Sequence, residues 1–461
     1  MPLRIFSEQE RRRYPGNWAS IERKVIMLVH SFVLPEDLEV EYGKVVPCIE
    51  CPAENVSCGG PDFSLREVVP DAGGASVFGV RVSGGRLTVC RARTVDGVNF
   101  TDTRDLFEVP EPDHKWLARD IAVTDKGECI LLICDMGRPP TSGHRFHVFS
   151  GGVDGAGWEK RNDESVYLGQ DSFCALWSGD RIINYQTTYQ KYSKRFPDNM
   201  GGDIRRVLHI RTSPDGLEWT PGGSFAVDGP WLPEDQLIVP DEGDPEETEF
   251  YKFSAFEFRS FYVGIMVKYI SQPECVGLLP GWPHGPLYCA EWWLSRDGFK
   301  WLRPYDRNDC RLNALPLGFL YNLRTPMEIG ETLRWPLESA VLDISGNRFL
   351  GVECSANASV LSPPLNMKGV APRLHVSFNS VSGTRQTALR QGYVMAEITN
   401  CEGNVIEGFE RSKCMFSAGP DNVLNLAWRG SDTGALPADR KCRLRIMFRD
   451  ARIYTLECPE V

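Results

Sequence analysis

A short turn motif recurs along this chain, and its recurrence restricts the fold more than any other feature. The motif reads Ser/Thr-x-Asp-Gly-x-x-aromatic and is centred on Asp96, Asp215 and Asp297, with a looser copy at Asp154. An Asp-Gly pair makes a tight hairpin turn because glycine adopts positive φ without steric cost. We therefore expect these four aspartates to have structural roles at outer hairpins.

The spacing of the motif indicates a repeated sheet. Successive copies lie 58, 61 and 82 residues apart, and alternating strands precede three of them at 87–93, 206–211 and 288–294. One such period accommodates four short antiparallel strands, as in a propeller blade. Residues 318–345 supply a shortened fifth copy. The sequence thus predicts an all-β chain with a five-bladed β-propeller over residues 61–350.

The two ends of the chain lack the turn motif. Strands with clean alternation recur at 373–378, 392–398, 424–428 and 443–448, which is typical of an antiparallel β-sandwich. We assign the sandwich to residues 351–461. Residues 1–60 are interpreted as an N-terminal segment that packs on the propeller.

Composition excludes several classes of function. The 461 residues carry a net charge of −11, which gives no electrostatic footprint for nucleic acid or an anionic membrane. The longest apolar run, 25–34, is too short to span a bilayer. The 15 scattered cysteines indicate mostly buried free thiols rather than a disulfide scaffold. We expect a cytoplasmic protein, although a chain whose secretion signal had been removed would read the same way.

The repeats followed by a sandwich resemble the five-bladed glycoside hydrolases related to families 32 and 43. The C-terminal stretches 396–409, 426–432 and 443–454 are similar to those of uncharacterised bacterial glycosidase-like proteins. The resemblance covers about residues 65–461. It implies the propeller and sandwich architecture, but such a fold also hosts transglycosidases and binding proteins.

Four acids occur near the expected innermost strands of successive blades. They are Asp71, Asp120, Asp171 and Glu249. The innermost strands of a propeller start at its central funnel, so acids in equal phase would converge there. Glycoside cleavage requires one carboxylate as nucleophile or base and one carboxylic acid that protonates the leaving oxygen.

The family resemblance suggests roles for these acids. The pair Arg119-Asp120 is similar to the Arg-Asp pair of family 32, whose aspartate steadies the transition state. The first family acid would fall at Asp71 and the third at Asp171, where the family usually has glutamate. Glu249, one blade later, is an alternative acid, so the identity of the acid remains open.

Sugar binding requires flat apolar platforms and polar side chains that bond hydroxyl groups. We select the following substrate-binding candidates: Arg119, Tyr251, Trp282, His284, Trp292 and Arg324. Trp282 and His284 lie in a long insertion of the fourth repeat, and such loops commonly overhang active sites.

Other motifs give weaker signals. Cys48, Cys51 and Cys58 begin like a zinc site but no fourth ligand follows at a suitable spacing. The acidic stretch 233–249 is either a solvated linker or a calcium site. No phosphate-binding loop, dinucleotide fingerprint or nucleophile elbow is present. We therefore predict no cofactor and no metal.

The sequence favours an exo-acting glycoside hydrolase, with a furanosidase or a transglycosidase as specific forms. The alternatives are a non-catalytic carbohydrate-binding propeller, or a sialidase-like or lyase enzyme. Sialidases share the Asp-Gly-aromatic turn, but their Arg-Ile-Pro-type opening is missing. The expected partner is a carbohydrate substrate, with no nucleic acid and no membrane, and the sandwich is a candidate surface for a homo-oligomer.

Overall fold

The computed structural model describes sixteen segments of the chain. They are residues 28–31, 38–57, 60–71, 73–84, 86–109, 116–135, 143–221, 232–259, 261–276, 284–303, 310–338, 340–354, 356–378, 392–419, 423–437 and 441–458. Within them the chain is nearly all β, and every strand pairing between named strands is antiparallel. The described α-helices are the short α2 (Cys310–Asn313) and α3 (Leu317–Tyr321). The prediction of an all-β chain is confirmed.

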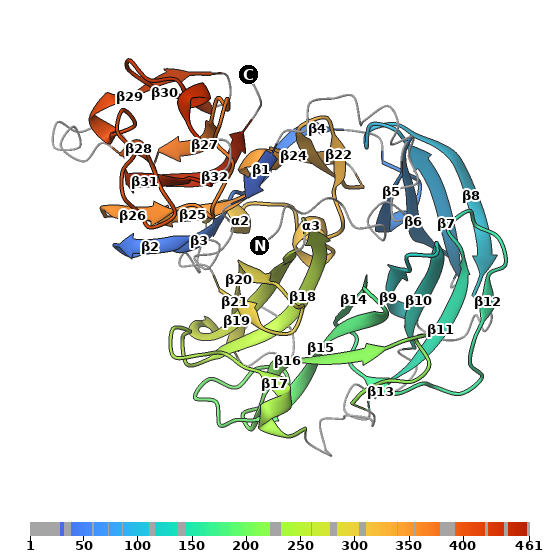
Figure 1. Cartoon of the computed structure of the whole chain (residues 1–461). Helices are drawn as coiled ribbons and strands as arrows, with labels where there is room; N and C mark the ends of the chain where they lie inside the picture. The colour runs from blue at the N-terminus through green and yellow to red at the C-terminus, as the bar shows by residue number, and fades with distance from the viewer. Residues whose placement is uncertain are drawn as a thin grey trace.

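Five sheets follow one another along the middle of the chain, and we number them ring sheets 1 to 5 (Figure 1). Ring sheet 1 holds β5 (Ser64–Asp71), β6 (Gly74–Ser83), β7 (Arg86–Thr94) and β8 (Phe100–Glu108). Ring sheet 2 holds β9 (Trp116–Val123), β10 (Glu128–Asp135), β11 (His144–Gly152), β12 (Glu159–Lys160) and β13 (Leu168–Gly169).

The next two sheets repeat the same order. Ring sheet 3 holds β14 (Phe173–Ser178), β15 (Arg181–Lys191), β16 (Ile204–Ser213) and β17 (Leu237–Ile238). Ring sheet 4 holds β18 (Thr248–Phe258), β19 (Phe261–Val276), β20 (His284–Ser295) and β21 (Trp301–Leu302).

Ring sheet 5 is completed by a strand from the other end of the chain. It holds β22 (Met327–Ile329), β23 (Thr332–Pro336), β24 (Ala340–Ser345) and β4 (Ala53–Ser57). Because β4 precedes β5 in the sequence but pairs with β24, the chain itself ties the fifth sheet to the first.

Apolar clusters join each ring sheet to the next. Adjacent residues on β10 lie on opposite faces of ring sheet 2: Leu131 packs toward ring sheet 1 and Ile130 toward ring sheet 3. Similar clusters join ring sheets 3 and 4 and ring sheets 4 and 5. A last cluster joins Met327 on β22 to Leu65 and Val68 on β5. The five sheets therefore form a closed ring, and their inner strands β5, β9, β14, β18 and β22 surround its centre (Figure 1).

Two further sheets form a second unit beside the ring (Figure 1). One holds β29 (Cys414–Ala418), β30 (Val423–Trp428), β27 (Arg373–Phe378), β32 (Ala451–Cys458), β25 (Leu350–Cys354), β3 (Val46–Ile49) and β1 (Leu28–Ser31). The other holds β2 (Glu39–Tyr42), β26 (Ala358–Leu361), β31 (Arg443–Arg449) and β28 (Tyr393–Thr399). One large apolar cluster draws on residues of both sheets, including Val352, Leu374 and Ile446.

The N-terminal segment differs from our expectation. We expected residues 1–60 to pack on the ring, but β1, β2 and β3 pair with β32, β26 and β25 of the second unit. Among the described strands of this segment, β4 alone pairs within the ring. The pairing partners lie roughly 300 to 430 residues away, so no local sequence pattern indicates them.

The recurring turn has a defined hydrogen-bond pattern. Asp215 Oδ1 accepts from the backbone N–H groups of Leu217 (2.8 Å) and Glu218 (3.1 Å). Ser213 Oγ accepts from the N–H of Gly216 (2.8 Å), and Trp219 Nε1 donates to the carbonyl of Gly216 (2.7 Å). The turn thus satisfies its own backbone, as its motif predicts.

The glycine of each turn packs against the preceding ring sheet. Gly298 has φ +76°, and a Cβ there would lie 2.9 Å from Ile183 Cδ1 and 3.0 Å from Tyr185 Oη. Gly216 has φ +83° and faces Ile130 at 3.0 Å in the same way. The turns therefore fasten neighbouring sheets together as well as reversing the chain.

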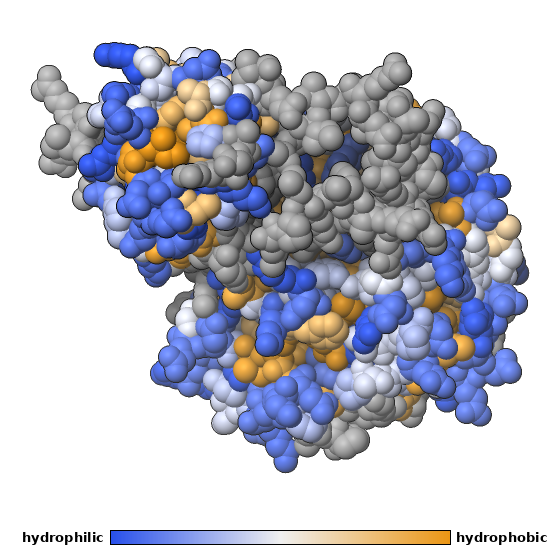
Figure 2. Space-filling model, viewed as in Figure 1, coloured by the Kyte–Doolittle hydropathy of each residue, from blue (hydrophilic) through white to orange (hydrophobic). Residues whose placement is uncertain are grey.

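The described surface is mainly hydrophilic, with apolar patches on both units (Figure 2). No described helix is long and apolar enough to cross a membrane. Most of the described cysteines are buried, Cys48 among them, while Cys51 is partly exposed and Cys58 lies outside the described residues.

Candidate active site

Asp120 connects two inner strands of the ring. It lies on β9, where its Oδ1 accepts from the N–H of Ile121 (3.0 Å). Its Oδ2 accepts from the N–H of Ala175 on β14 (3.0 Å). The side chain is partly exposed although it lies deep in the molecule. Asp120 is therefore a carboxylate fixed between ring sheets 2 and 3.

A second carboxyl group, Glu67 on β5, lies near Asp120. Glu67 Oε1 accepts from the N–H of Val68 (2.8 Å), and the side chain is also partly exposed. Burial and the negative charge of Asp120 raise the pKa of Glu67 to about 8. A carboxyl group with this pKa is mostly protonated at neutral pH and is able to donate a proton.

Three cationic side chains surround these two acids: Arg66 on β5, Lys252 on β18 and Arg324, which precedes β22. We call these five residues the central cluster. Burial raises the pKa of Asp120, while Lys252, two backbone N–H groups and Arg324 oppose that rise. Burial lowers the pKa of Lys252, and burial together with Arg66 lowers that of Arg324 to about 9.

Asp171 lies at the edge of this site. It directly precedes β14, its side chain is exposed, and its charge acts on Lys252 and on Tyr251. Of the four acids selected from the sequence, Asp120 and Asp171 are therefore the two that share a neighbour at the centre of the ring.

Asp71 is not at the centre, so its predicted convergence with the other acids is wrong. We expected an innermost strand to begin near Asp71, but the innermost strand is β5, which ends at Asp71 instead of starting there. Asp71 forms a half-exposed ion pair with Arg93, close to the Asp-Gly turn. Asp71 therefore lies at the last residue of its inner strand, whereas residues that open an inner strand lie at its start.

Glu249 is also wrong as an acid at the centre of the ring, because its carboxylate is paired within a buried ionic network. Its Oε1 accepts from Lys194 (2.6 Å) and its Oε2 from Arg206 (3.0 Å), and both cations also contact Asp198 at 3.0 and 2.8 Å. Tyr269 donates a further hydrogen bond to Asp198. We call these residues the closed network; two cations match two carboxylates, and Glu249 is only 1 % exposed.

The acidic stretch 233–249 contributes a second matched network. Asp244 pairs with Arg303 (2.5 Å) and Lys268 (3.3 Å), and both cations also contact Glu291 at 2.6 Å. Asp241 pairs with Arg303 at 3.0 Å. Among the described residues no group of three His, Cys, Asp or Glu side chains is arranged to hold a metal ion.

The predicted substrate-binding residues lie in different environments. Arg324 joins the central cluster. Tyr251 is partly exposed and lies near Asp171, beside Tyr269 (5.5 Å between ring centroids), Tyr288 (5.9 Å) and Tyr321 (6.2 Å). Trp292 is wrong as a binding residue, because it packs in the core between ring sheets 4 and 5 and is 4 % exposed.

The remaining binding candidates are not settled by the described side chains. Arg119 is placed only by its backbone on β9, where it pairs with Ile133. His284 is placed only by its backbone at the start of β20. Trp282 lies outside the described residues.

The sequence analysis missed Glu67, Arg66 and Lys252. The available signal was the alternating segment 64–71, which contains Glu67 and lies 53 residues before Asp120, close to the repeat period. Spacing alone does not separate Glu67 from Asp71, since both fit the period. The assignment requires knowing which strand is innermost, and only the pairing of β5 with β6 gives that.

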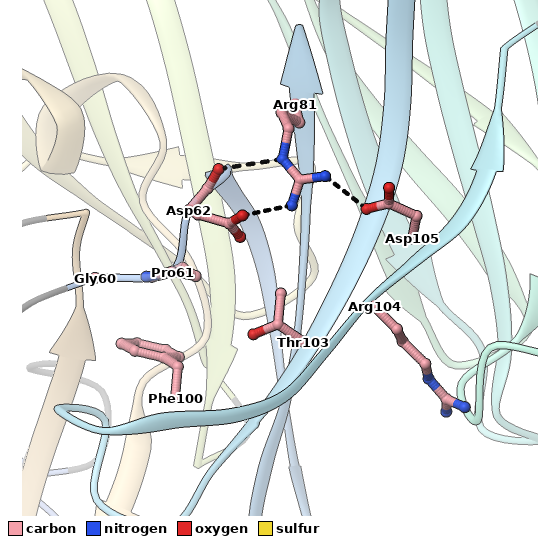
Figure 3. Close-up of a pocket in the computed structure, with 8 residues that line it drawn as sticks. All are labelled: Gly60, Pro61, Asp62, Arg81, Phe100, Thr103, Arg104 and Asp105. Atoms are coloured by element: carbon pink, nitrogen blue, oxygen red, sulfur yellow. Dashed lines mark hydrogen bonds and ion pairs between the residues drawn. The ribbon is translucent and has the colours of Figure 1, made fainter. Parts of the chain in front are cut away.

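A surface cavity of about 520 Å³ lies elsewhere, on ring sheet 1 (Figure 3). Arg81 occupies it and pairs with Asp62 and Asp105, each at 2.7 Å. Both carboxylates are more than half exposed and no residue of the central cluster lines the cavity. Since its charges are already paired at the surface, we do not assign the active site to it.

Comparisons with known proteins give a likeness of general shape. No family model matches the chain, and no curated protein sequence matches it significantly. Solved structures named as glycoside hydrolases are similar in structure at low sequence identity.

Three solved structures illustrate this likeness. A family 117 glycoside hydrolase of the marine bacterium Zobellia galactanivorans is 12% identical, with a TM-score of 0.34, over 58% of this chain and 75% of that one. An α-L-arabinofuranosidase of Fusarium graminearum is 10% identical, with a TM-score of 0.34, over 68% and 82%. A fructofuranosidase of Schwanniomyces occidentalis is 8% identical, with a TM-score of 0.35, over 89% and 97%. At these TM-scores the likeness carries no argument about the site or its chemistry.

Proposed function

We propose that this chain is a glycoside hydrolase whose ring of sheets is a five-bladed β-propeller and whose second unit is a β-sandwich. The closed series of apolar clusters supports the propeller. The observation that supports hydrolysis is the pair of neighbouring carboxyl groups, Glu67 and Asp120, on adjacent inner strands of the ring, both on partly exposed residues.

The environments of the two acids fit the two roles that glycoside cleavage requires. Glu67, with its raised pKa, protonates the leaving oxygen as general acid. Asp120 receives two backbone N–H groups and lies near Lys252 and Arg324, all of which favour its carboxylate form. As a carboxylate it serves as nucleophile or base, or stabilises the positive charge of the transition state.

Two further residues complete the proposed site. Asp171 at its edge supplies a third carboxylate near Lys252, and Tyr251 offers an aromatic face against which a sugar ring stacks. The spacing of the working carboxyl groups would decide the stereochemistry, with retention at about 5 Å and inversion at about 6.5–9.5 Å.

The experiment is a panel of aryl furanosides and pyranosides, assayed with the wild type and with Glu67→Gln, Asp120→Asn and Asp171→Asn. We expect one or more substrates to be hydrolysed, and kcat/KM to fall about 10²–10⁴-fold in Glu67→Gln and Asp120→Asn. Asp71→Asn is the matched control, because Asp71 lies at the far end of the same inner strand as Glu67. Equal losses in Asp71→Asn and Asp120→Asn would contradict the proposed site.

A non-catalytic carbohydrate-binding propeller is the second candidate. The observation in its favour is that both oxygens of Asp120 already accept backbone hydrogen bonds, as in a carboxylate with a purely structural role. Sugar binding without turnover of any aryl glycoside would favour this candidate.

A further inference from the structure

The three cations of the central cluster are anchored by neutral groups. Arg66 donates to Asn322 Oδ1 (2.9 Å) and Ser64 Oγ (3.0 Å). Arg324 donates to the carbonyl of Leu65, and Lys252 to that of Phe173. Among the described residues, no carboxylate oxygen lies within 4.0 Å of these three cations.

This anchoring differs from that of comparably buried cations in the same molecule. Lys194, Arg206 and Lys268 each contact two carboxylates, and Arg303 contacts three. Burial of a cation is costly unless an anion is paired with it. The cations of the central cluster therefore lack the direct carboxylate contacts that these four cations have.

Two donors in the cluster have no acceptor among the described residues. Arg324 is 7 % exposed, and its Nε is buried without a hydrogen-bond partner. The Nε of Arg66 is likewise buried and has no partner. A planar guanidinium with open N–H positions matches a carboxylate or sulfate, which accepts two parallel hydrogen bonds.

The charges at the centre of the ring of sheets also favour the binding of an anion. Arg66, Lys252 and Arg324 lie near the charges of Asp120, of Glu338 and, at the edge, of Asp171, but none of the three forms a direct ion pair with a described carboxylate. Glu67 adds little negative charge at neutral pH because burial and Asp120 raise its pKa. An incoming anionic group would thus meet three cations that have no direct anionic contact among the described residues, in partly desolvated surroundings where electrostatic attraction is strong.

We propose that the central cluster binds the anionic group of an acidic sugar, with Arg324, Arg66 and Lys252 facing a carboxylate or sulfate carried by the sugar. This inference rests on the proposed function and narrows its substrate class to anionic glycans. A hexuronate and a sulfated hexose share the required chemistry.

The test combines binding and turnover. Calorimetric titrations use galacturonate and glucuronate, galactose 6-sulfate, and the matched neutral sugars galactose and glucose. Hydrolysis is assayed on the corresponding aryl uronides, sulfated aryl galactosides and neutral aryl glycosides. The acidic sugars should bind at least about tenfold more tightly than the neutral ones. Their affinity should fall as salt is added, because counterions screen the attraction.

Variants assign the effect to the cluster. Lys252→Met and Arg324→Gln should each lower the affinity for the acidic sugar by a clearly larger factor than the affinity for the neutral one, so that most of the preference is lost. Arg81→Gln is the control, because Arg81 is paired with two exposed carboxylates on the surface of ring sheet 1. Circular dichroism identifies a variant that fails to fold, and Lys252→Met then replaces Arg324→Gln as the decisive variant.

Each outcome decides a separate point. Preference for uronates or for sulfated sugars, lost in the cluster variants, supports the inference and identifies the anion. Hydrolysis of neutral glycosides without any such preference overturns the inference and leaves the proposed function standing. Tight binding of acidic sugars without hydrolysis of any aryl glycoside supports the anion site and overturns the proposed hydrolase. Absence of binding to every sugar overturns the inference.

Discussion

The closed network and the central cluster are both dense sets of charges inside the ring, but only the closed network is held by direct ion pairs among the described residues. In the closed network every charged group contacts an opposite charge within 3.0 Å, and solvent hardly reaches it. In the central cluster the cations bond to neutral groups, and several members are partly exposed. Buried charges that form ion pairs within the protein have a structural role. Buried charges without a direct ion pair, near solvent, indicate a place where a bound molecule supplies the opposite charge.

The pKa directions separate individual acids rather than the two sets, since burial also raises the pKa of Glu249 in the closed network. In the closed network burial raises the pKa of Asp198, but Arg206 and Lys194 outweigh it and lower that pKa to about 2. In the central cluster burial and a like charge dominate, and the pKa of Glu67 rises instead. Two acids inside the same ring are thus driven in opposite directions by their partners.

The largest expected effect on stability comes from breaking the closed network. Glu249→Gln should lower the free energy of unfolding by about 3–5 kcal/mol, because it leaves buried Lys194 and Arg206 with a single carboxylate between them. Chemical denaturation measures this loss. The control is Glu128→Gln, which removes an exposed pair with Arg161 and should cost at most about 1 kcal/mol. Equal losses in the two variants would contradict the distinction between the two kinds of charge.

This contrast also shows how far the sequence leads. The turn motif predicted the sheets around it, since Asp, Gly and the aromatic residue interact within one turn. The role of Glu249 was not predictable, because its partners Lys194 and Arg206 flank a connection more than forty residues away. Asp71 was misassigned because we expected an innermost strand to begin near it, whereas the innermost strand β5 ends there. Arg324 and Asp120 were identified, but their proximity depends on closure of the ring.

The next largest effect concerns a turn that fastens two ring sheets. Gly298→Ala should lower the free energy of unfolding by about 1–3 kcal/mol, because the new Cβ would crowd Ile183 and Tyr185 at a positive φ. Gly330→Ala is the matched control, since Gly330 has φ +63° with nothing within 4 Å of a Cβ. A loss no greater in Gly298→Ala than in Gly330→Ala would show that the contact between sheets does not matter.

An effect that is smaller per pH unit, but spread over several units, should follow from pH at the central cluster. The folded protein keeps the Glu67 proton up to about pH 8, whereas the unfolded chain loses it near the ordinary glutamate pKa. Between these values the unfolded state binds fewer protons, so this group makes stability fall as pH rises, by at most about 1.4 kcal/mol per pH unit. Thermal unfolding of the wild type and Glu67→Gln from pH 5 to 8.5 measures it. The variant should lose less stability over that range; parallel curves would contradict the raised pKa.

The smallest effect is expected at the far end of the inner strand. Asp71→Asn removes a half-exposed pair with Arg93 and should change the free energy of unfolding by about 0–1 kcal/mol. Because Asp71 is remote from the central cluster, sugar binding and turnover should stay at the wild-type level. A loss of turnover in this variant would place the working site at the other end of the strand.

The proposed hydrolysis depends on an acid in the middle of the ring that is poised to donate a proton. A ¹³C NMR titration of glutamate carboxyl groups in the wild type and in Glu67→Gln measures that property without a substrate. We expect one resonance, missing from the variant, that titrates with a midpoint near 8. A midpoint near the ordinary value of about 4.3 for the same resonance would contradict the assignment of Glu67 as the acid.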